Sequence, residues 1–398
     1  MIKRMISIIT LVAFLLVGGA GVVATTPTAA DMVTRVFLAE TFSADWFSAD
    51  VLAQVPLAQL EAIVAQYKEV LGEFIEAEGV GPNFNLIFAK GSAPAQVILD
   101  SAGKIAGFLL GVPVPKADGL QEVLDLFAEL PGAVSVLVAS ETGVLGALDP
   151  TTPLGVGSAF KLAVLAALKD QVSSGALAWD DVVRLEEKHL SLPTGILQAW
   201  PPGTSLTIQT LAALMISISD NTATDVLIDI VGREVVEMYA PHNVPLLTTR
   251  ELFVLKNPVN SAYLDAYRQG DTAKRREILD AVQAAPLPDV FLFSDGPVAL
   301  DLEWFFTVGE LANLMFYVKD LPLMTINPGV ENEYWQRIAF KGGSEPGVLN
   351  LTSAVTNSTG KTYVISATWN HSESLDETRF ISLYSALLDV LAQMDAAQ

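Results

Sequence analysis

The sequence has no cysteine among its 398 residues and only three histidines. Without cysteine the chain can form no disulfide and offers no thiolate ligand for a metal. The histidines are His189, His242 and His371, which lie far apart and follow no zinc-binding spacing. The sequence therefore predicts neither a metal site nor a cofactor.

Basic residues are also scarce. The chain has 23 Lys and Arg against 45 Asp and Glu, a net charge of −22 at pH 7. This charge argues against binding to nucleic acid or to an anionic membrane surface. It does not restrict the substrate, because a local pocket can be positive within an acidic protein. A chain of this length exceeds the usual limit for one hydrophobic core, so two domains are expected.

The N-terminus combines two basic residues, Lys3 and Arg4, with an apolar run from about residue 5 to 17 and small residues up to Ala30. This order is typical of a secretory signal peptide, with cleavage after Ala24 or Ala30. An uncleaved membrane anchor is the alternative, because the apolar residues nearly reach spanning length. We predict a signal peptide over residues 1–30 and a secreted, periplasmic or otherwise extracytoplasmic protein.

Residues 31–115 predict a small α+β domain. Apolar residues at three- and four-residue steps indicate an amphipathic helix: Leu57, Leu60, Val64, Tyr67 and Leu71. Strands are expected at 85–89, 95–99 and 105–109, and the segment 112–115 is expected to be a stiff linker because of its prolines. No acid pair in this domain suggests catalysis, so it is expected to shape the rim of an active site or to bind a partner.

Residues 116–398 predict a largely antiparallel sheet covered by helices. Two hairpins are expected, one joining 133–139 to 144–148 and one joining 349–355 to 362–368, and a helix over 375–394 ends the chain. The predicted fold class is therefore two-domain α+β.

A serine and a lysine lie one helical turn apart at the start of a buried helix. Ser158 follows a glycine-rich entry and precedes the apolar run 160–168, and Lys161 falls on the same helix face. A buried lysine beside a second cation can be neutral, so Lys161 could act as general base for a nucleophilic Ser158. The alternative is an N-capping serine with a surface-reaching lysine.

A second polar cluster follows the helical pattern 206–218. Ser219 can pass a proton to a leaving group, and Asn221 offers a donor and an acceptor to a substrate amide or ester. Asp220 between them is expected to brace the loop. A simple N-cap with turn residues is the alternative.

A third cluster follows the strand-like run 336–340. Lys341 places a positive charge there, and Gly343 leaves room for a ligand beside the strand. The backbone N–H groups of Ser158 and Ser344 are expected to form an oxyanion hole, with Lys341 binding a substrate carboxylate. A glycine turn with a surface lysine is the alternative.

Together the three clusters resemble the signature elements of the penicillin-recognising serine enzymes, in the class A β-lactamase-like branch. The resemblance runs from about residue 120 to the end and includes the segments 200–208 and 304–311. It implies the catalytic and binding roles given above. The domain order resembles the two-domain serine hydrolases of the clavulanic acid gene cluster type, in which a nuclear-transport-factor-2-like cone of the steroid isomerase type comes first.

The sequence departs from this family at two points. The glutamate that activates the deacylating water in class A β-lactamases has no match at the expected spacing. Glu251 is a candidate substitute, but a surface or ion-paired glutamate beside Arg250 is the favoured interpretation. Gly342 replaces a hydroxyl residue that commonly holds the substrate carboxylate, so Ser344 would have to supply the hydroxyl. Acyl-enzymes formed from β-lactams should therefore decay slowly.

The favoured function is a serine hydrolase that acts on a small ester, a β-lactam or a cell-wall peptide through an acyl-Ser158 intermediate. Within it, an esterase or a weak β-lactamase is preferred, and a cell-wall D-Ala peptidase is the nearest alternative. A non-catalytic penicillin-binding or peptidoglycan sensor and a structural partner-binding protein are the other classes.

Overall fold

The computed structural model describes residues 27–293, 296–330 and 334–397, and the chain divides into two compact units. The first unit runs to Gly119 and includes residues 378–390, and the second comprises residues 120–377 and 391–398. The predicted signal peptide lies outside the described residues except for positions 27–30, of which Ala30 is already in the first turn of a helix. No helix within the described ranges is long and apolar enough to cross a membrane.

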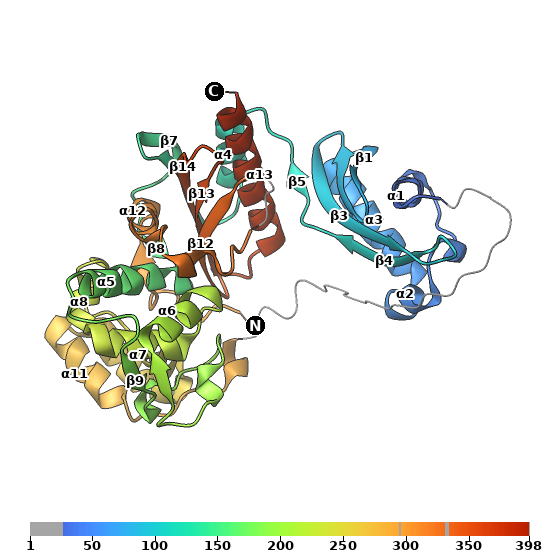
Figure 1. The fold of residues 1–398 in the computed structure, drawn as a ribbon. Helices are drawn as coiled ribbons and strands as arrows, with labels where there is room; N and C mark the ends of the chain where they lie inside the picture. The colour runs from blue at the N-terminus through green and yellow to red at the C-terminus, as the bar shows by residue number, and fades with distance from the viewer. Residues whose placement is uncertain (1–26, 294–295, 331–333, 398) are drawn as a thin grey trace. The chain divides into compact units, whose positions relative to one another are not determined.

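In the first unit, helices precede an antiparallel sheet (Figure 1). The helices are α1 (Ala29–Leu38), α2 (Ala49–Gln54) and α3 (Leu57–Leu71). The strands are β1 (Phe74–Val80), β2 (Asn83–Phe88), β3 (Gly91–Leu99), β4 (Ile105–Leu110) and β5 (Val114–Pro115). The predicted amphipathic helix is confirmed as α3, which buries Leu60, Val64 and Leu71 in the core of this unit.

Two parts of the first unit differ from the sequence prediction. Strand β1 was not anticipated, because its residues are mostly exposed and do not alternate clearly between apolar and polar. The segment expected to be a stiff linker is partly a strand, because Val114 and Pro115 pair with Ser92 and Gly91 of β3. An edge position tolerates proline, which has no N–H to donate to a neighbouring strand.

The second unit contains a five-stranded antiparallel sheet in the order β12-β13-β14-β6-β7. Its strands are β6 (Ala133–Ser140), β7 (Gly143–Leu148), β12 (Arg337–Glu345), β13 (Val348–Thr356) and β14 (Thr362–Asn370). Both predicted hairpins are confirmed, as β6 with β7 and β13 with β14. Strand β12 forms one edge of the sheet, which leaves its outer side free of a neighbouring strand.

Helices and short strands complete the second unit. The helices are α4 (Leu120–Ala128), α5 (Lys161–Ser173), α6 (Ile208–Ser217), α7 (Asn221–Val231), α8 (Arg233–Glu237), α9 (Thr249–Lys256), α10 (Ser261–Gln269), α11 (Thr272–Val282) and α12 (Val308–Val318). The short strands are β8 (Leu154–Gly155), β9 (Val182–Arg184), β10 (Ser205–Thr207) and β11 (Phe305–Phe306). The predicted last helix is α13 (Glu377–Ala396), whose residues are divided between the two units.

Helix α5 lies in the core of the second unit. Its residues from Lys161 to Leu168 are all buried, as expected of a helix that is apolar on every face. Phe160, directly before it, stacks on Trp304 with ring centroids 4.0 Å apart. Because α5 packs against α7 and α12, its N-terminal end has a rigid position.

Candidate active site

Ser158 lies in a 3-10 turn, Gly157–Phe160, that leads directly into α5. Its side chain is half-buried, whereas its neighbours Gly157 and Ala159 are buried. Gly157 has a φ of +49°, a left-handed conformation that glycine adopts without strain. The turn therefore presents the Ser158 hydroxyl at the surface of a buried helix end.

The Lys161 ammonium is held by the second polar cluster. Nζ donates to the Ser219 carbonyl oxygen at 2.7 Å, to Ser219 Oγ at 3.1 Å and to Asn221 Oδ1 at 2.7 Å. These three bonds use all the donors of an ammonium group. Within the part of the chain that the structure describes, no hydrogen bond joins Lys161 to Ser158 Oγ, although the two residues are one helical turn apart.

Two lysines share the Ser219 hydroxyl. Lys341 Nζ donates to Ser219 Oγ at 3.1 Å, the same distance as Lys161 Nζ. Both lone pairs of Oγ are then used, so its proton is available to a third group. Ser219 has a φ of +56°, an uncommon conformation for a residue with a side chain and one that is often found at functional sites.

Burial of the two lysines changes their ionisation. Burial lowers the pKa of Lys161 well below its usual value, and the charge of Lys341 lowers it further against the opposing effect of Asp220 and Asp225. Burial also lowers the pKa of Lys341 to about 7. The lowered pKa of Lys161 favours the neutral amine, the form that a general base requires.

Asn221 and Asp220 have structural contacts. The Asn221 amide accepts from Lys161 and donates to the Leu192 carbonyl at 3.0 Å, so its predicted contact with a substrate stays a prediction. Asp220 accepts from the backbone N–H groups of Ala223, Ile196 and Leu197 at 2.7 to 3.0 Å. Its expected role in bracing the loop is confirmed.

The third cluster lies within a strand instead of at its end. Lys341, Gly343 and Ser344 all belong to β12, which continues to Glu345. The strand lies directly against the turn that carries Ser158: a Cβ at Gly343 would lie 2.4 Å from Ser158 N and 2.1 Å from Val156 O. A Cβ at Gly157 would lie 3.1 Å from Ser344 N, so the predicted oxyanion N–H groups of Ser158 and Ser344 are close together.

Glu251 forms its hydrogen bonds with Arg233 and with the N-terminal cap of α9. Its carboxylate accepts two hydrogen bonds from Arg233, at 2.8 and 2.7 Å, and one from Thr248 N at 2.8 Å. It is the N3 residue of the capping box of α9. Glu251 is ion-paired, as one of the two expectations had it, but its partner is Arg233, and the side chain is buried and not at the surface. The neighbouring Arg250 donates to backbone carbonyl groups.

Sequence reasoning missed a buried charge cluster next to β12. Lys256 donates to Glu303, and to Glu345 Oε2 at 2.7 Å. Burial raises the pKa of Glu303 to about 8, and the adjacent Glu345 acts in the same direction, while Lys256 opposes it. Glu303 Oε2 has no hydrogen-bond donor among the described residues, and a proton on this oxygen allows it to donate to Glu345.

The raised pKa of Glu303 should make the free energy of unfolding depend on pH. The folded-state pKa of about 8 lies above the ordinary value of 4.5, so this contribution to stability is present at low pH and is lost as the pH rises through about 8. Glu303→Gln keeps a neutral side chain of the same shape. Urea unfolding should give similar stabilities for variant and wild type at pH 5, and a variant more stable by about 2 kcal/mol at pH 9.

The exposed Glu277, which pairs with Lys274, supplies a matched control. Glu277→Gln should follow the wild-type pH profile. A stability difference between Glu303→Gln and wild type that stays constant from pH 5 to 9 would show that Glu303 is ionised in the folded protein.

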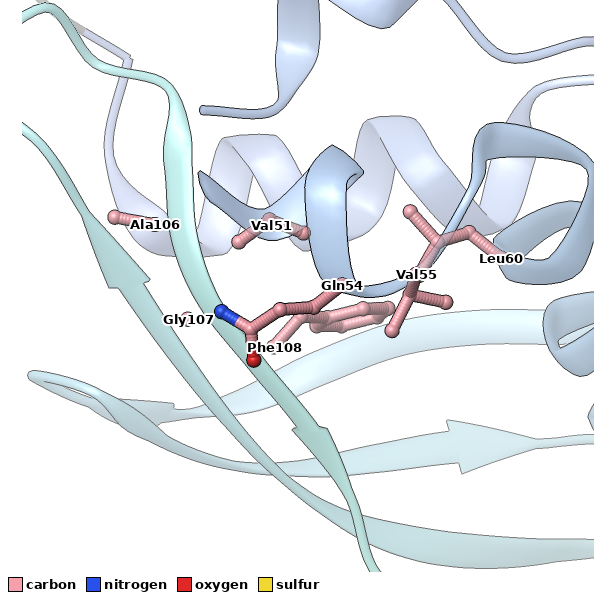
Figure 2. Close-up of a pocket in the computed structure, with 7 residues that line it drawn as sticks. All are labelled: Val51, Gln54, Val55, Leu60, Ala106, Gly107 and Phe108. Carbon is pink, nitrogen blue, oxygen red and sulfur yellow. The ribbon is translucent and has the colours of Figure 1, made fainter. Parts of the chain in front are cut away.

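Ser158 lines neither of two small pockets, one in each unit. Figure 2 shows the one in the first unit, which Val51, Gln54, Val55, Leu60 and Phe108 line, with the Gln54 amide next to Gly107. Its volume of about 30 Å³ is enough for about one water molecule and far below that of a substrate pocket. The other, of about 90 Å³, lies beside Glu303 and Trp304. Within the described residues, no group of three or more His, Asp or Glu side chains is arranged to hold a metal ion.

The chain was compared with known proteins. Residues 118–251, about a third of the chain, match the model of the beta-lactamase enzyme family. The matched segment includes Ser158, Lys161, Ser219 and Asn221. This segment is therefore similar to the beta-lactamase-like serine enzymes, which the sequence motifs also resemble. No match was found among curated protein sequences.

Solved structures show a likeness over about 70% of this chain. A beta-lactamase from Sphaerobacter thermophilus is 19% identical with a TM-score of 0.49, and the alignment covers 70% of this chain and 98% of that one. A representative class A beta-lactamase from Bacteroides cellulosilyticus is 19% identical with a TM-score of 0.49, over 69% of this chain and 96% of that one. At these values the likeness carries no information about substrate.

Proposed function

We propose that the protein is a serine hydrolase that cleaves ester or amide substrates through an acyl-Ser158 intermediate. The observation that carries this proposal is the shared Ser219 hydroxyl, which accepts from both Lys161 and Lys341 at 3.1 Å. Two buried lysines on one hydroxyl disfavour a second positive charge, which supports a neutral amine as proton acceptor. The beta-lactamase family match over residues 118–251 agrees with this assignment.

In the proposed reaction, Ser158 Oγ attacks the substrate carbonyl carbon and its proton moves to neutral Lys161. The carbonyl oxygen becomes an oxyanion that accepts from the N–H groups of Ser158 and Ser344. When the tetrahedral intermediate collapses, the bond to the leaving group breaks and Ser219 gives that group its proton. Lys161, now charged, returns a proton to Ser219. Water then hydrolyses the acyl-Ser158 ester and releases the acid.

We propose that deacylation is slow with β-lactams. Both carboxylate oxygens of Glu251 accept hydrogen bonds from Arg233, and one also accepts from Thr248 N in the helix cap. We therefore propose that Glu251 does not activate the deacylating water. This favours an esterase or a weak β-lactamase. The same observation supports a second candidate, a penicillin-binding or peptidoglycan sensor that stays acylated. A cell-wall D-Ala peptidase remains an alternative with the same first step.

We also propose secretion through a signal peptide at residues 1–30, and a nuclear-transport-factor-2-like identity for residues 31–115, ahead of the hydrolase domain at 116–398. The helices followed by an antiparallel sheet in the first unit support the second of these proposals. Cell fractionation and N-terminal sequencing of the mature protein would test the first. A role for this unit at the active-site rim or in partner binding follows from the same proposal.

The proposed function is tested by intact mass spectrometry with the protein lacking residues 1–26. The protein is mixed with p-nitrophenyl butyrate and, separately, with benzylpenicillin, and any adduct is mapped by peptide digestion. We expect release of p-nitrophenol with the acyl group on the peptide containing Ser158, and a penicilloyl adduct that persists for minutes or longer. Absence of both ester turnover and any adduct, or an adduct on a different residue, would overturn the proposal. A stable adduct with no turnover of either compound would favour the sensor.

A further inference from the structure

Position 342 of β12 offers no hydroxyl group that could donate a hydrogen bond to a substrate carboxylate. Position 342 is glycine, and a Cβ there would lie 2.9 Å from the Phe340 ring and 3.0 Å from the Asn350 carbonyl oxygen. The Phe340 ring occupies the space beside Gly329, where a Cβ would lie 2.1 Å from its Cε1. The ring is therefore held over this part of the strand, and a hydroxyl-bearing side chain at 342 has no room unless it moves.

The one hydroxyl that β12 does offer next to the oxyanion position is turned toward a carboxylate. Ser344 Oγ donates to Glu377 Oε1 at 3.3 Å. Glu377 is the first residue of α13 and is half-buried, and among the described residues it makes no ion pair. A negative charge therefore lies where sequence reasoning expected the negative charge of a substrate.

The positive charge on the other side of the site faces inward. Lys341 is 3% exposed and donates to Ser219 Oγ and to the Gly342 carbonyl oxygen. Burial lowers its pKa to about 7, which weakens the positive charge that Lys341 offers to a carboxylate. Glu345, the carboxylate on β12, is paired with Lys256, so this lysine does not neutralise Glu377.

The residues that flank Ser219 add apolar surface. Ile218, directly before it, is 40% exposed, and Ile196, whose N–H donates to Asp220, is 46% exposed. Exposed isoleucines beside polar catalytic groups are typical of a surface that contacts an apolar ligand.

We propose that the site selects uncharged, apolar esters and that Glu377 rejects substrates that carry a carboxylate near the scissile bond. This inference rests on the proposed serine hydrolase function and narrows it, because β-lactams and peptides with a free carboxyl end are then disfavoured substrates, which acylate Ser158 more slowly than uncharged esters do. Glu377 acts as a specificity-determining residue by repelling a carboxylate that approaches Ser344, whose hydroxyl it binds.

The test uses two matched esters, the butyrates of 3-hydroxybenzamide and of 3-hydroxybenzoic acid, which differ in a single group and in charge. The ratio of their kcat/KM values is measured for each protein. Because both values refer to the same sample, a difference in the fraction of folded enzyme does not affect this ratio. Wild type should prefer the carboxamide ester by about tenfold or more at low ionic strength, and Glu377→Gln should reduce this preference by about tenfold. Glu373→Gln, four residues earlier and exposed, changes the net charge equally and should keep the wild-type ratio.

The possible results distinguish failure of the proposed carboxylate rejection from failure of the proposed serine hydrolase function. Hydrolysis with the same preference in wild type and Glu377→Gln, or a wild-type preference for the carboxylate ester, would overturn the inference while the hydrolase assignment stands. Equal changes in Glu377→Gln and Glu373→Gln would also overturn it, because they would assign the effect to net charge. If neither ester is hydrolysed through Ser158, the proposed function fails and the inference fails with it.

Discussion

Ser158→Ala should lower kcat for p-nitrophenyl butyrate by about 10⁴-fold or more, the order of loss seen when a serine nucleophile is removed. The reason is that covalent catalysis ends when Oγ is absent, whereas Lys161, Ser219 and the N–H groups of β12 remain in place. Residual hydrolysis would come from the oxyanion site and from substrate binding. Steady-state kinetics together with intact mass would show the loss of both turnover and adduct.

The same substitution should leave stability nearly unchanged. Ser158 is half-buried and, within the described residues, makes no side-chain hydrogen bond, so its removal should shift the unfolding free energy by less than about 1 kcal/mol. Ser173→Ala, at the exposed other end of α5, is a matched control that should keep wild-type kinetics. Ester hydrolysis by Ser158→Ala within tenfold of wild type would place the nucleophile elsewhere.

Gly343→Ala should abolish most of the activity and destabilise the second unit. A Cβ at this position would lie 2.1 Å from Val156 O, 2.4 Å from Ser158 N and 2.7 Å from Ala159 N. These are backbone atoms that cannot move independently, so the substitution must push β12 away from the turn that carries Ser158. The gap between the N–H groups of Ser158 and Ser344 would widen, and loss of an oxyanion donor lowers kcat by about 10²- to 10³-fold.

Gly342→Ala is the matched control for this prediction. Its Cβ would meet the Phe340 ring at 2.9 Å and the Asn350 carbonyl oxygen at 3.0 Å, contacts that a small ring movement can partly relieve. Kinetics and thermal unfolding should show a much smaller loss than for Gly343→Ala. Equal effects of the two substitutions would mean that the contact between β12 and the Ser158 turn does not determine the geometry of the site.

Much of the fold could be predicted because its signals are local. The apolar run after Phe160 is buried on all sides as α5, and the apolar runs on either side of residues 141–142 and 357–361 appear as the paired strands of two hairpins. Strand β1 could not be predicted, because most of its residues are exposed and its register shifts between Phe74 and Glu76. Its sequence therefore lacks the regular alternation of apolar and polar residues that indicates a strand. The pairing of Val114 with β3 was missed because proline residues argue for a linker when tertiary contacts are unknown.

The sequence by itself determined which groups are candidates for chemistry. Ser158 and Lys161 come together at the start of one helix because side chains three residues apart share a helix face. Motif order then predicted that Ser219 and Lys341 would join them, and the structure brings Lys161, Ser219 and Lys341 into hydrogen-bond contact.

Only the tertiary structure decided which partner each charge has. Glu251 pairs with Arg233, Lys256 joins Glu303 and Glu345, and Glu377 accepts from Ser344. These partners are between 18 and 89 residues apart. Side-chain periodicity reports only which face of its own element a residue occupies, whereas strand pairing and helix packing decide which distant charges meet and how far burial shifts their pKa values.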